Sequence, residues 1–300
     1  MTAFATATAR GDTVSAAGGG RFLVYSVTKT FLAVLALLLA ERGRLRLDGS
    51  VLEWIDLDGV PDVSLRRLLD HTSGIRDYGR LRSYHEAVRE SPGAAWPDEE
   101  LVARALEGGA EFAPGEGWAY SNTGYLLARR ALEAAAGPLQ AALSEHVLEP
   151  LGLHETSVAE TRDDLRELVP AASRQVASND VRAVYDPRWV GHRALASTAA
   201  DLARFISALT GGRILQDASF AELTRLHDVP VEVAWFSRPS YGLGVMADPE
   251  HPSGLVLGHG GGGPGWTACV FGVRGRAAAV LEAREGAALE ARTLELLAGA

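Results

Sequence analysis

The chain has 300 residues, of which 47% are apolar and 22% are charged, and its formal net charge is −9. A chain of this length buries roughly three quarters of its unfolded surface, in one large domain or in two that share a core. The negative charge argues against nucleic acid and anionic membranes as partners, because both attract clustered positive charge.

The cysteine and histidine content argues against a metal or a disulfide framework. Cys269 is the only cysteine and lies in an apolar run, where we expect a buried, inert thiol. The eight histidines show no His-Glu-x-x-His or comparable spacing. We therefore expect neither a metal nor another cofactor.

The N-terminal region shows no targeting segment. The first twenty residues lack the basic and apolar regions of a signal peptide, and the apolar run 31–40 is too short to span a bilayer. We therefore expect a cytoplasmic protein as the sequence stands, or an exported one if the sequence is a trimmed mature form.

The first sixty residues predict a hairpin followed by a buried helix. Residues 3–9 and 13–17 alternate as strands do and are joined by an Arg-Gly-Asp turn, and a third apolar piece follows at 22–24. A helix is predicted from Ser26 to about Glu41. Its apolar residues occupy every face, which is typical of a helix buried all round.

The middle of the chain is predicted to be helical and its end to form strands. Helices are expected over 65–70, 98–106, 122–136, 139–148, 198–209 and 218–226, and a last one over 285–297. Strands are expected over 243–246, 255–257, 267–273 and 277–281. This order predicts an α+β fold in which one sheet, formed by both chain ends, is flanked by helices. We divide it into a sheet domain, 1–60 with 237–300, and a mainly helical domain inserted at 61–236.

The stretch Ser26-x-x-Lys29 contains the only lysine of the chain, against twenty-eight arginines. Arginine cannot be deprotonated in a protein, whereas a buried lysine amine can lose its proton and act as a base. Helical residues three apart share a face, so Ser26 and Lys29 are placed to meet as nucleophile and amine. Considered alone, the pattern is equally compatible with a lysine that has no special role in an arginine-rich composition.

Two further stretches are ambiguous when each is considered alone. Tyr120-Ser121-Asn122 precedes a predicted helix. Asn122 can be explained as the cap of that helix and Tyr120 as a core aromatic. Alternatively, the Tyr120 phenol beside an amine can relay a proton. The glycine-rich stretch 258–265 is either a flexible turn or a place where backbone N–H groups approach a ligand. A dinucleotide fingerprint is excluded there because a strand, not a helix, follows.

Residues 68–75 form a predicted helix end and turn. We interpret His71 and Thr72 as structural residues that support hydrogen bonds of this turn. The sequence indicates no catalytic role for either side chain.

Together and in this order, Ser26-x-x-Lys29, Tyr120-Ser121-Asn122 and His259-Gly260-Gly261 resemble the three active-site motifs of the serine β-lactamase and penicillin-binding-protein superfamily. The likeness is to the branch of class C β-lactamases, D-alanyl-D-alanine carboxypeptidases and related esterases. It extends over nearly the whole chain, because residues 68–75, 150–153, 197–205 and 241–244 also look like this family. The resemblance implies a β-lactamase/transpeptidase-like fold with an antiparallel sheet.

The resemblance also implies roles for single residues. Ser26 would be the acylated nucleophile, Lys29 would take part in its deprotonation, and Tyr120 would be the general base or proton relay. Asn122 would orient Lys29 and the substrate. The backbone amides of Ser26 and of Gly262, the residue after Gly261, would form the oxyanion hole. His259 stands where β-lactamases usually have a lysine, which removes a positive charge that would hold a β-lactam carboxylate.

We therefore expect a serine hydrolase that cleaves a small ester, amide or peptide through an acyl-enzyme, as a carboxylesterase or a D-alanyl-D-alanine carboxypeptidase does, with weak β-lactamase activity at most. An acyltransferase of the same family is one alternative. A penicillin-binding covalent sensor that stays acylated is another.

Overall fold

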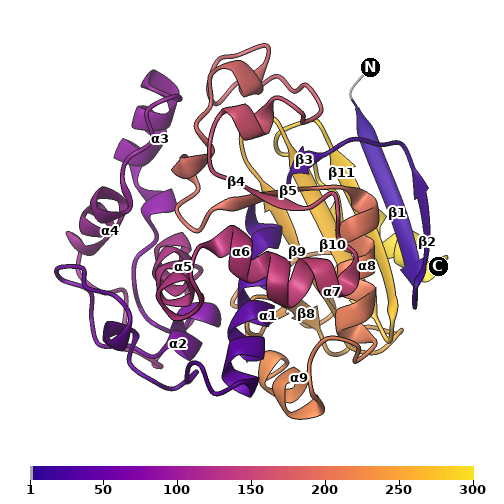
Figure 1. Cartoon of the computed structure of the whole chain (residues 1–300), viewed down its shortest axis with the longest axis horizontal. Coiled ribbons are helices and arrows are strands. Elements are labelled where there is room, and N and C mark those ends of the chain that lie inside the picture. The colour runs from indigo at the N-terminus through magenta and orange to yellow at the C-terminus, as the bar shows by residue number, and fades with distance from the viewer. Residues whose placement is uncertain (1–2) are drawn as a thin grey trace.

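The computed structural model describes residues 3–300 and shows an eight-stranded antiparallel sheet built from both chain ends (Figure 1). The strands lie in the order β2 (Thr13–Ala17), β1 (Phe4–Arg10), β11 (Arg276–Glu282), β10 (Thr267–Val273), β9 (Val256–Gly262), β8 (Met246–Asp248), β7 (Ser240–Tyr241) and β6 (His227–Asp228). The N-terminal hairpin therefore joins the sheet beside the last strand. This confirms the predicted α+β class.

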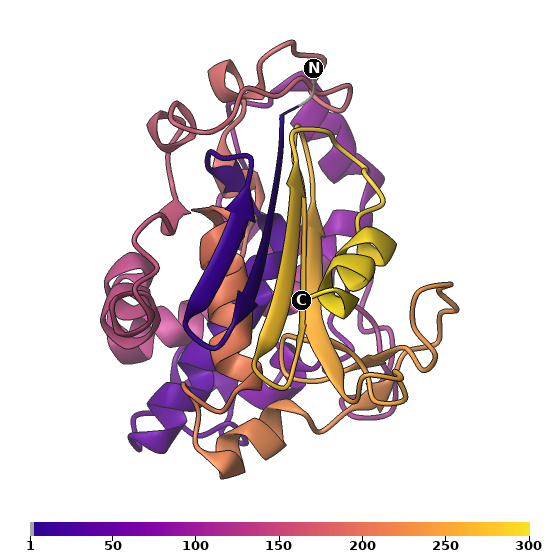
Figure 2. The ribbon, with the colours of Figure 1, turned by 90° about the vertical axis from the view of Figure 1, so that its right-hand side faces the viewer.

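The centre of the sheet is covered on both faces, which explains its continuous apolar strands. Along β10, Ala268 and Val270 belong to the main core, whereas Cys269 and Phe271 belong to a smaller core on the other side. Helix α8 (Ala199–Thr210) packs on one face and α10 (Glu290–Ala298) on the other, as Figure 2 shows. Cys269 is a free, buried thiol, as predicted.

Helices fill the chain between the two parts of the sheet. They are α1 (Thr28–Glu41), α2 (Leu65–Leu69), α3 (Arg82–Glu90), α4 (Asp98–Leu106), α5 (Asn122–Ala136), α6 (Leu139–Leu143), α7 (Glu149–Leu151) and α9 (Asp217–Leu223), besides α8 and α10. Every residue of α1 from Thr28 to Leu39 is buried, which confirms the predicted all-round burial. Phe31 of α1 stacks on Phe205 of α8 at 3.8 Å between ring centroids. The start of α1 is therefore held rigidly.

The glycine-rich stretch differs from the prediction. Strand β9 does not end at Leu257 but continues to Gly262, paired with β10. A Cβ at Gly258 would lie 2.0 Å from the Val270 carbonyl oxygen, and one at Gly261 would lie 2.2 Å from the Val24 carbonyl oxygen. These glycines therefore permit close packing of a strand and do not form a flexible turn.

Two regions without a clear sequence period also contain regular structure. Helix α3 lies in a stretch for which the sequence predicts no helix. It is strongly polar and Val88 is its only buried residue, so few apolar residues mark it in the sequence. A second small sheet joins β3 (Phe22–Leu23), β5 (Ala194–Ser197) and β4 (Ser157–Ala159). Strands this short give no detectable alternation.

The division at residues 60 and 237 stays a prediction. We propose to keep this division. Helix α8 crosses it, because it belongs to the segment 61–236 by sequence but packs against β1, β10 and β11 of the sheet. Among the described residues, no helix has both the length and the apolar content needed to cross a membrane.

Candidate active site

Ser26 lies in a short 3₁₀ turn, Tyr25–Val27, that leads directly into α1. Tyr25, immediately before it, has a φ of 46°, in the left-handed region that costs a non-glycine residue about 1–2 kcal/mol. The Tyr25 hydroxyl donates a hydrogen bond to the Pro264 carbonyl at 2.5 Å. The strained turn is thus tied to the end of the glycine-rich strand, and such strain is typical of functional sites.

Lys29 lies one turn after Ser26, and its side chain is fully buried. Its Nζ lies 3.0 Å from Ser26 Oγ, 2.7 Å from Asn122 Oδ1 and 3.4 Å from His192 Nε2. Burial lowers the pKa of the Lys29 amine from 10.5 to about 7, although the Asp77 carboxylate opposes the decrease. The amine is therefore able to exchange a proton near neutral pH.

Asp77 fixes the orientation of Asn122. The Asp77 carboxylate accepts hydrogen bonds from the Asn122 backbone N–H and from Asn122 Nδ2, both at 3.1 Å. The amide oxygen of Asn122 is thereby directed at Lys29. Ser121, not Asn122, caps α5, because its hydroxyl accepts the N–H of Gly124. The cap explanation therefore applies to the neighbour, and Asn122 is free to contact Lys29.

Tyr120 lies above this amine. Lys29 Nζ is 4.8 Å from the centroid of the Tyr120 ring. Burial raises the pKa of the Tyr120 phenol, and a hydrogen bond with Ser26 partly opposes that increase. The His71 ring packs against Tyr120 at 4.3 Å between centroids, and His71 Nδ1 accepts the Ser121 N–H at 3.1 Å. The His71 ring therefore supports the loop that carries Tyr120. It makes no hydrogen bond within its own turn, residues 68–75, where Thr72 donates to Asp70.

His259 on β9 has both ring nitrogens engaged. Nδ1 lies 2.5 Å from the Gly260 carbonyl, to which it can only donate, so Nε2 accepts from the Tyr241 hydroxyl at 2.9 Å. Burial and the nearby Lys29 lower the pKa of His259 to about 3. The imidazole is therefore neutral near pH 7 and supplies no positive charge to the site.

Strand β9 brings its backbone alongside Ser26. A Cβ at Gly261 would lie 2.8 Å from the Ser26 backbone nitrogen, so only glycine permits this approach. Strand β8 pairs with β9 only as far as Gly258, and the following residues, Gly260 to Gly263, line a cavity. Backbone N–H groups near Ser26 are what an oxyanion site requires.

Ser26 lies between two spaces of different character. The larger has a volume of about 680 Å³ and an apolar wall formed by Trp118, Val229, Val231, Val233, Trp235, Phe236, Tyr241 and Met246. The smaller, about 180 Å³, is lined mainly by Tyr25, Tyr78, Tyr84, Asn122, Tyr185 and His192. Ser26, Gly262 and Gly263 line both spaces. The two halves of a substrate on either side of a scissile bond therefore have separate places to bind.

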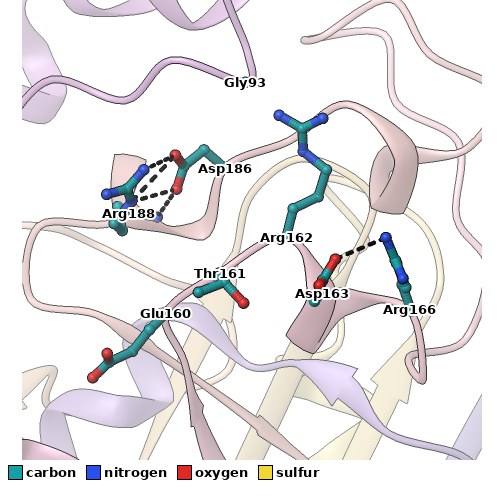
Figure 3. A pocket seen from close by; sticks show the side chains of 8 residues that line it. All are labelled: Gly93, Glu160, Thr161, Arg162, Asp163, Arg166, Asp186 and Arg188. Atoms are coloured by element: carbon teal, nitrogen blue, oxygen red, sulfur yellow. Dashed lines mark hydrogen bonds and ion pairs between the residues drawn. The ribbon is translucent and has the colours of Figure 1, made fainter.

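Another pocket of about 420 Å³ lies elsewhere on the molecule and shares no lining residue with these two spaces (Figure 3). Its charges balance: three arginines, Arg162, Arg166 and Arg188, face Glu160, Asp163 and Asp186. The dashed lines in Figure 3 show Arg166 paired with Asp163 and Arg188 with Asp186. It lacks an activated nucleophile, so the cavity at Ser26 is the candidate active site. Within residues 3–300, no three His, Cys, Asp or Glu side chains gather in a way that could hold a metal.

Comparison with known proteins agrees with this geometry. A sequence model of the β-lactamase family matches residues 2–300. The chain belongs to the β-lactamase family. Penicillin-binding protein 4* of Bacillus subtilis is 28% identical over 82% of this chain and 56% of its own length, and esterase EstB of Burkholderia gladioli is 35% identical over 45% and 37%. Both matches therefore leave a large part of these relatives uncovered.

A solved structure is similar to this chain over its whole length. The D-stereospecific amidohydrolase from a Streptomyces species superposes with a TM-score of 0.84 and 29% sequence identity, over 100% of this chain and 95% of its own. This likeness agrees with the family match.

The fold brings the motif residues of this β-lactamase-family chain to one place. Ser26, Tyr120, His259, Gly261 and Gly262 line the larger cavity, with Lys29 buried below Ser26 and Asn122 beside it. Their roles in catalysis stay predictions.

Three further residues of the site were missed by the sequence interpretation. Asp77 and His192 lie in irregular segments with no periodic pattern, so only the fold shows that they reach Asn122 and Lys29. Tyr241 lies in a stretch that resembled the family, but nothing in the sequence indicated its hydrogen bond to His259.

Proposed function

We propose that this chain is a serine hydrolase that forms an acyl-enzyme on Ser26 and cleaves an ester or an amide. One observation carries the proposal. The buried amine of Lys29, whose pKa is lowered to about 7, lies 3.0 Å from the hydroxyl of Ser26, and Ser26 lines a cavity. A weak nucleophile such as serine needs an adjacent base, and this geometry supplies one.

Lys29 is the base of the first step. The Ser26 proton moves to Lys29 Nζ while Oγ bonds to the scissile carbonyl carbon. Tyr120 is a neutral phenol at pH 7, because burial raises its pKa, so it passes a proton on and does not abstract one unaided. It hands the proton from Lys29 to the leaving group. In the second step, a water gives up a proton along the same route to Lys29 while its oxygen bonds to the acyl carbon. The bond between that carbon and Ser26 Oγ then breaks, Oγ takes the proton back from Lys29, and the acid is released.

The backbone N–H groups of Ser26 and Gly262 receive the oxyanion. Gly261 allows β9 to approach the Ser26 nitrogen, and the strand has no partner on its β8 side after Gly258 among the described residues. Removal of one such donor typically costs about 3 kcal/mol of transition-state stabilisation.

The charges of the larger cavity favour a substrate without a carboxylate. Its charged lining residues are Arg80 and Glu290. Arg80 lies 3.5 Å from Glu111, whereas Glu290 has no ion-pair partner in the described part of the chain. The neutral His259 adds no cation. We therefore place neutral esters and amides before β-lactams and peptides that end in a carboxylate, and the names of an esterase and an amidohydrolase among the similar proteins support this order.

The test compares wild type and Ser26→Ala with a chromogenic ester, a D-amino-acid amide, nitrocefin and a labelled penicillin, followed by intact-mass measurement. We expect turnover of the ester or the amide and a transient mass increase that Ser26→Ala abolishes. Unchanged ester hydrolysis by Ser26→Ala would refute the proposal.

The same experiment separates the alternatives. A stable penicillin adduct without turnover indicates a covalent sensor. Faster product formation after addition of an alcohol or amine acceptor, with a transferred acyl group in the product, indicates an acyltransferase.

A further inference from the structure

His192 is a buried histidine that the family motifs do not include. It lies between the 3₁₀ turn Pro187–Trp189 and β5, and its side chain is only 2% exposed. Its Nε2 lies 3.4 Å from Lys29 Nζ, and Nδ1 has no hydrogen-bond partner among residues 3–300. A polar group buried this deeply without full hydrogen bonding asks for an explanation beyond packing.

The chain around His192 is strained and firmly attached to the start of α1. Arg193 has a φ of 65°, which an arginine rarely adopts. The Gly191 N–H donates to the Tyr78 hydroxyl at 2.8 Å, and the Leu195 N–H donates to Thr28 Oγ1 at 2.9 Å. Because Thr28 precedes Lys29, these bonds hold the imidazole in a set position relative to the amine.

We infer that His192 is a positioning residue that orients the Lys29 amine for proton transfer from Ser26. The inference rests on the proposed acyl-enzyme function. A neutral amine has two N–H donors and one lone pair. If Asn122 Oδ1 and His192 Nε2 accept the two N–H bonds, the lone pair is left to face Ser26 Oγ.

This arrangement requires the imidazole to be neutral with its proton on Nδ1. Burial, and after it the neighbouring Lys29, lower the pKa of His192. A proton on Nε2 would instead occupy the lone pair of Lys29 and block it as a base. The tautomer of His192 therefore decides whether Lys29 can receive the serine proton.

Most of the other titratable groups around Lys29 do not change charge near pH 7, so a shift in the kcat/KM profile there can be assigned to Lys29 and its partner Asp77. The titratable groups that face the amine are Asp77, His71, His259, Tyr120 and Tyr125. The pKa values of both histidines are lowered and those of both tyrosines are raised, so none of these four changes charge near pH 7. The pKa of Asp77 is raised by burial, so its titration belongs to the pair that it forms with Lys29.

The test uses His192→Leu, which removes the acceptor, and His192→Gln, which retains one. His146→Leu is the matched control, because His146 is also buried with an unpartnered Nε2 but lies in the Ser144–Leu148 segment, away from the site. For His192→Leu we expect kcat for ester hydrolysis to fall roughly 10-fold to 100-fold, with KM little changed, because misplacement of a catalytic group costs about this much. The acid limb of kcat/KM should move to lower pH, because the ammonium form of Lys29 loses an acceptor.

His192→Gln should recover most of the rate and of the pH profile, and His146→Leu should leave both unchanged. Wild-type kcat and pH profile in His192→Leu would overturn the inference. Equal losses in both His192 variants with an unmoved acid limb would also overturn it, since they indicate a purely structural residue. Ser26→Ala, assayed in parallel, keeps the two proposals apart: if it remains active, the acyl-enzyme proposal fails, and if it is inactive, an unaltered His192→Leu sinks only the role of His192.

Discussion

The two sides of Ser26 are built in different ways. Below it, Lys29 is fully buried and has three polar neighbours within 3.4 Å, and Asp77 holds one of them in place. Beside it, the wall of the larger cavity is formed largely by the segment 229–239, where Val231 is 52% exposed. In the proposed mechanism the buried side fixes the proton chemistry, whereas the exposed apolar side offers contact area without directional bonds. We therefore expect substitutions on the first side to change kcat and those on the second to change substrate preference.

The largest effect is expected from Lys29→Arg. Arginine keeps the positive charge and the approximate size but cannot lose its proton at usable pH. We expect kcat/KM for an ester to fall by about 10²–10⁴-fold, the usual contribution of a general base, with the far-ultraviolet circular dichroism spectrum unchanged. Near-wild-type turnover would show that the amine supplies charge only.

Asp77→Asn tests how the buried side is held. Asp77 acts through Asn122, so we expect kcat to fall roughly 10-fold to 100-fold through misorientation of the Asn122 amide. The pKa of Lys29 should fall as well, because Asp77 is the charge that raises it. Asp58, which is exposed and has no ion-pair partner within residues 3–300, is the control, and its substitution by asparagine should leave the enzyme as wild type. If the acid limb of the kcat/KM profile lies at the same pH in Asp77→Asn as in wild type, Asp77 does not raise the pKa of Lys29 as proposed.

Trp235→Ala tests the apolar side. Because Trp235 lines the larger cavity, its truncation should raise KM for an ester with a long or aromatic group about 10-fold and leave an acetyl ester nearly unaffected. Val231→Ser, at an exposed position of the same segment, should have a smaller effect. Equal losses with both esters would show that the segment supports catalysis and not substrate preference.

Glu290→Gln tests the charge of the cavity. Removal of an unpaired carboxylate should improve kcat/KM for anionic nitrocefin several-fold and leave a neutral ester unchanged, because a like charge disfavours the anion. The increase should shrink at high salt, since screening weakens the repulsion. An unchanged kcat/KM for nitrocefin would show that Glu290 does not influence substrate choice.

The smallest effect is on stability. The folded-state pKa of Lys29 lies near 7, below the unfolded value near 10.5, so the unfolded chain binds more protons between these values. The free energy of unfolding should therefore increase with pH from 7 to 9, by at most about 1.4 kcal/mol per pH unit from this group. Lys29→Met should remove that slope in urea titrations, and an unchanged slope would contradict a buried neutral amine.

Much of the fold could be predicted because its pattern is local. The hairpin 4–17, the all-round burial of α1 and the strands β10 and β11 follow from apolar periods that a continuous core imposes. The strand character of Gly258–Gly262 could not, because glycine carries no strand preference and the reason is a carbonyl of a distant segment.

The site divides in the same way. The lone lysine marks Ser26 and Lys29 because an ionisable amine has a distinct chemistry, and the order of the motifs adds Tyr120 and Asn122. Asp77 and His192 could not be identified from the sequence. Asp77 contacts Asn122, 45 residues away along the chain, and His192 contacts Lys29, 163 residues away. The sequence indicates the residues that we propose to react, and the fold shows which contacts orient their side chains.

Lys29, the one lysine, should be neutral in about half of the molecules near pH 7. Selective labelling with lysine carrying ¹³C at Cε gives a single resonance in a protein without a lysine-containing tag, since Lys29 is the only lysine. Its chemical shift, followed from pH 5 to 11, reports the protonation of Nζ directly. We predict a midpoint at about 7. A midpoint near the ordinary value of 10.5 would contradict the account, because the amine would then be an ammonium ion at working pH and no base for Ser26.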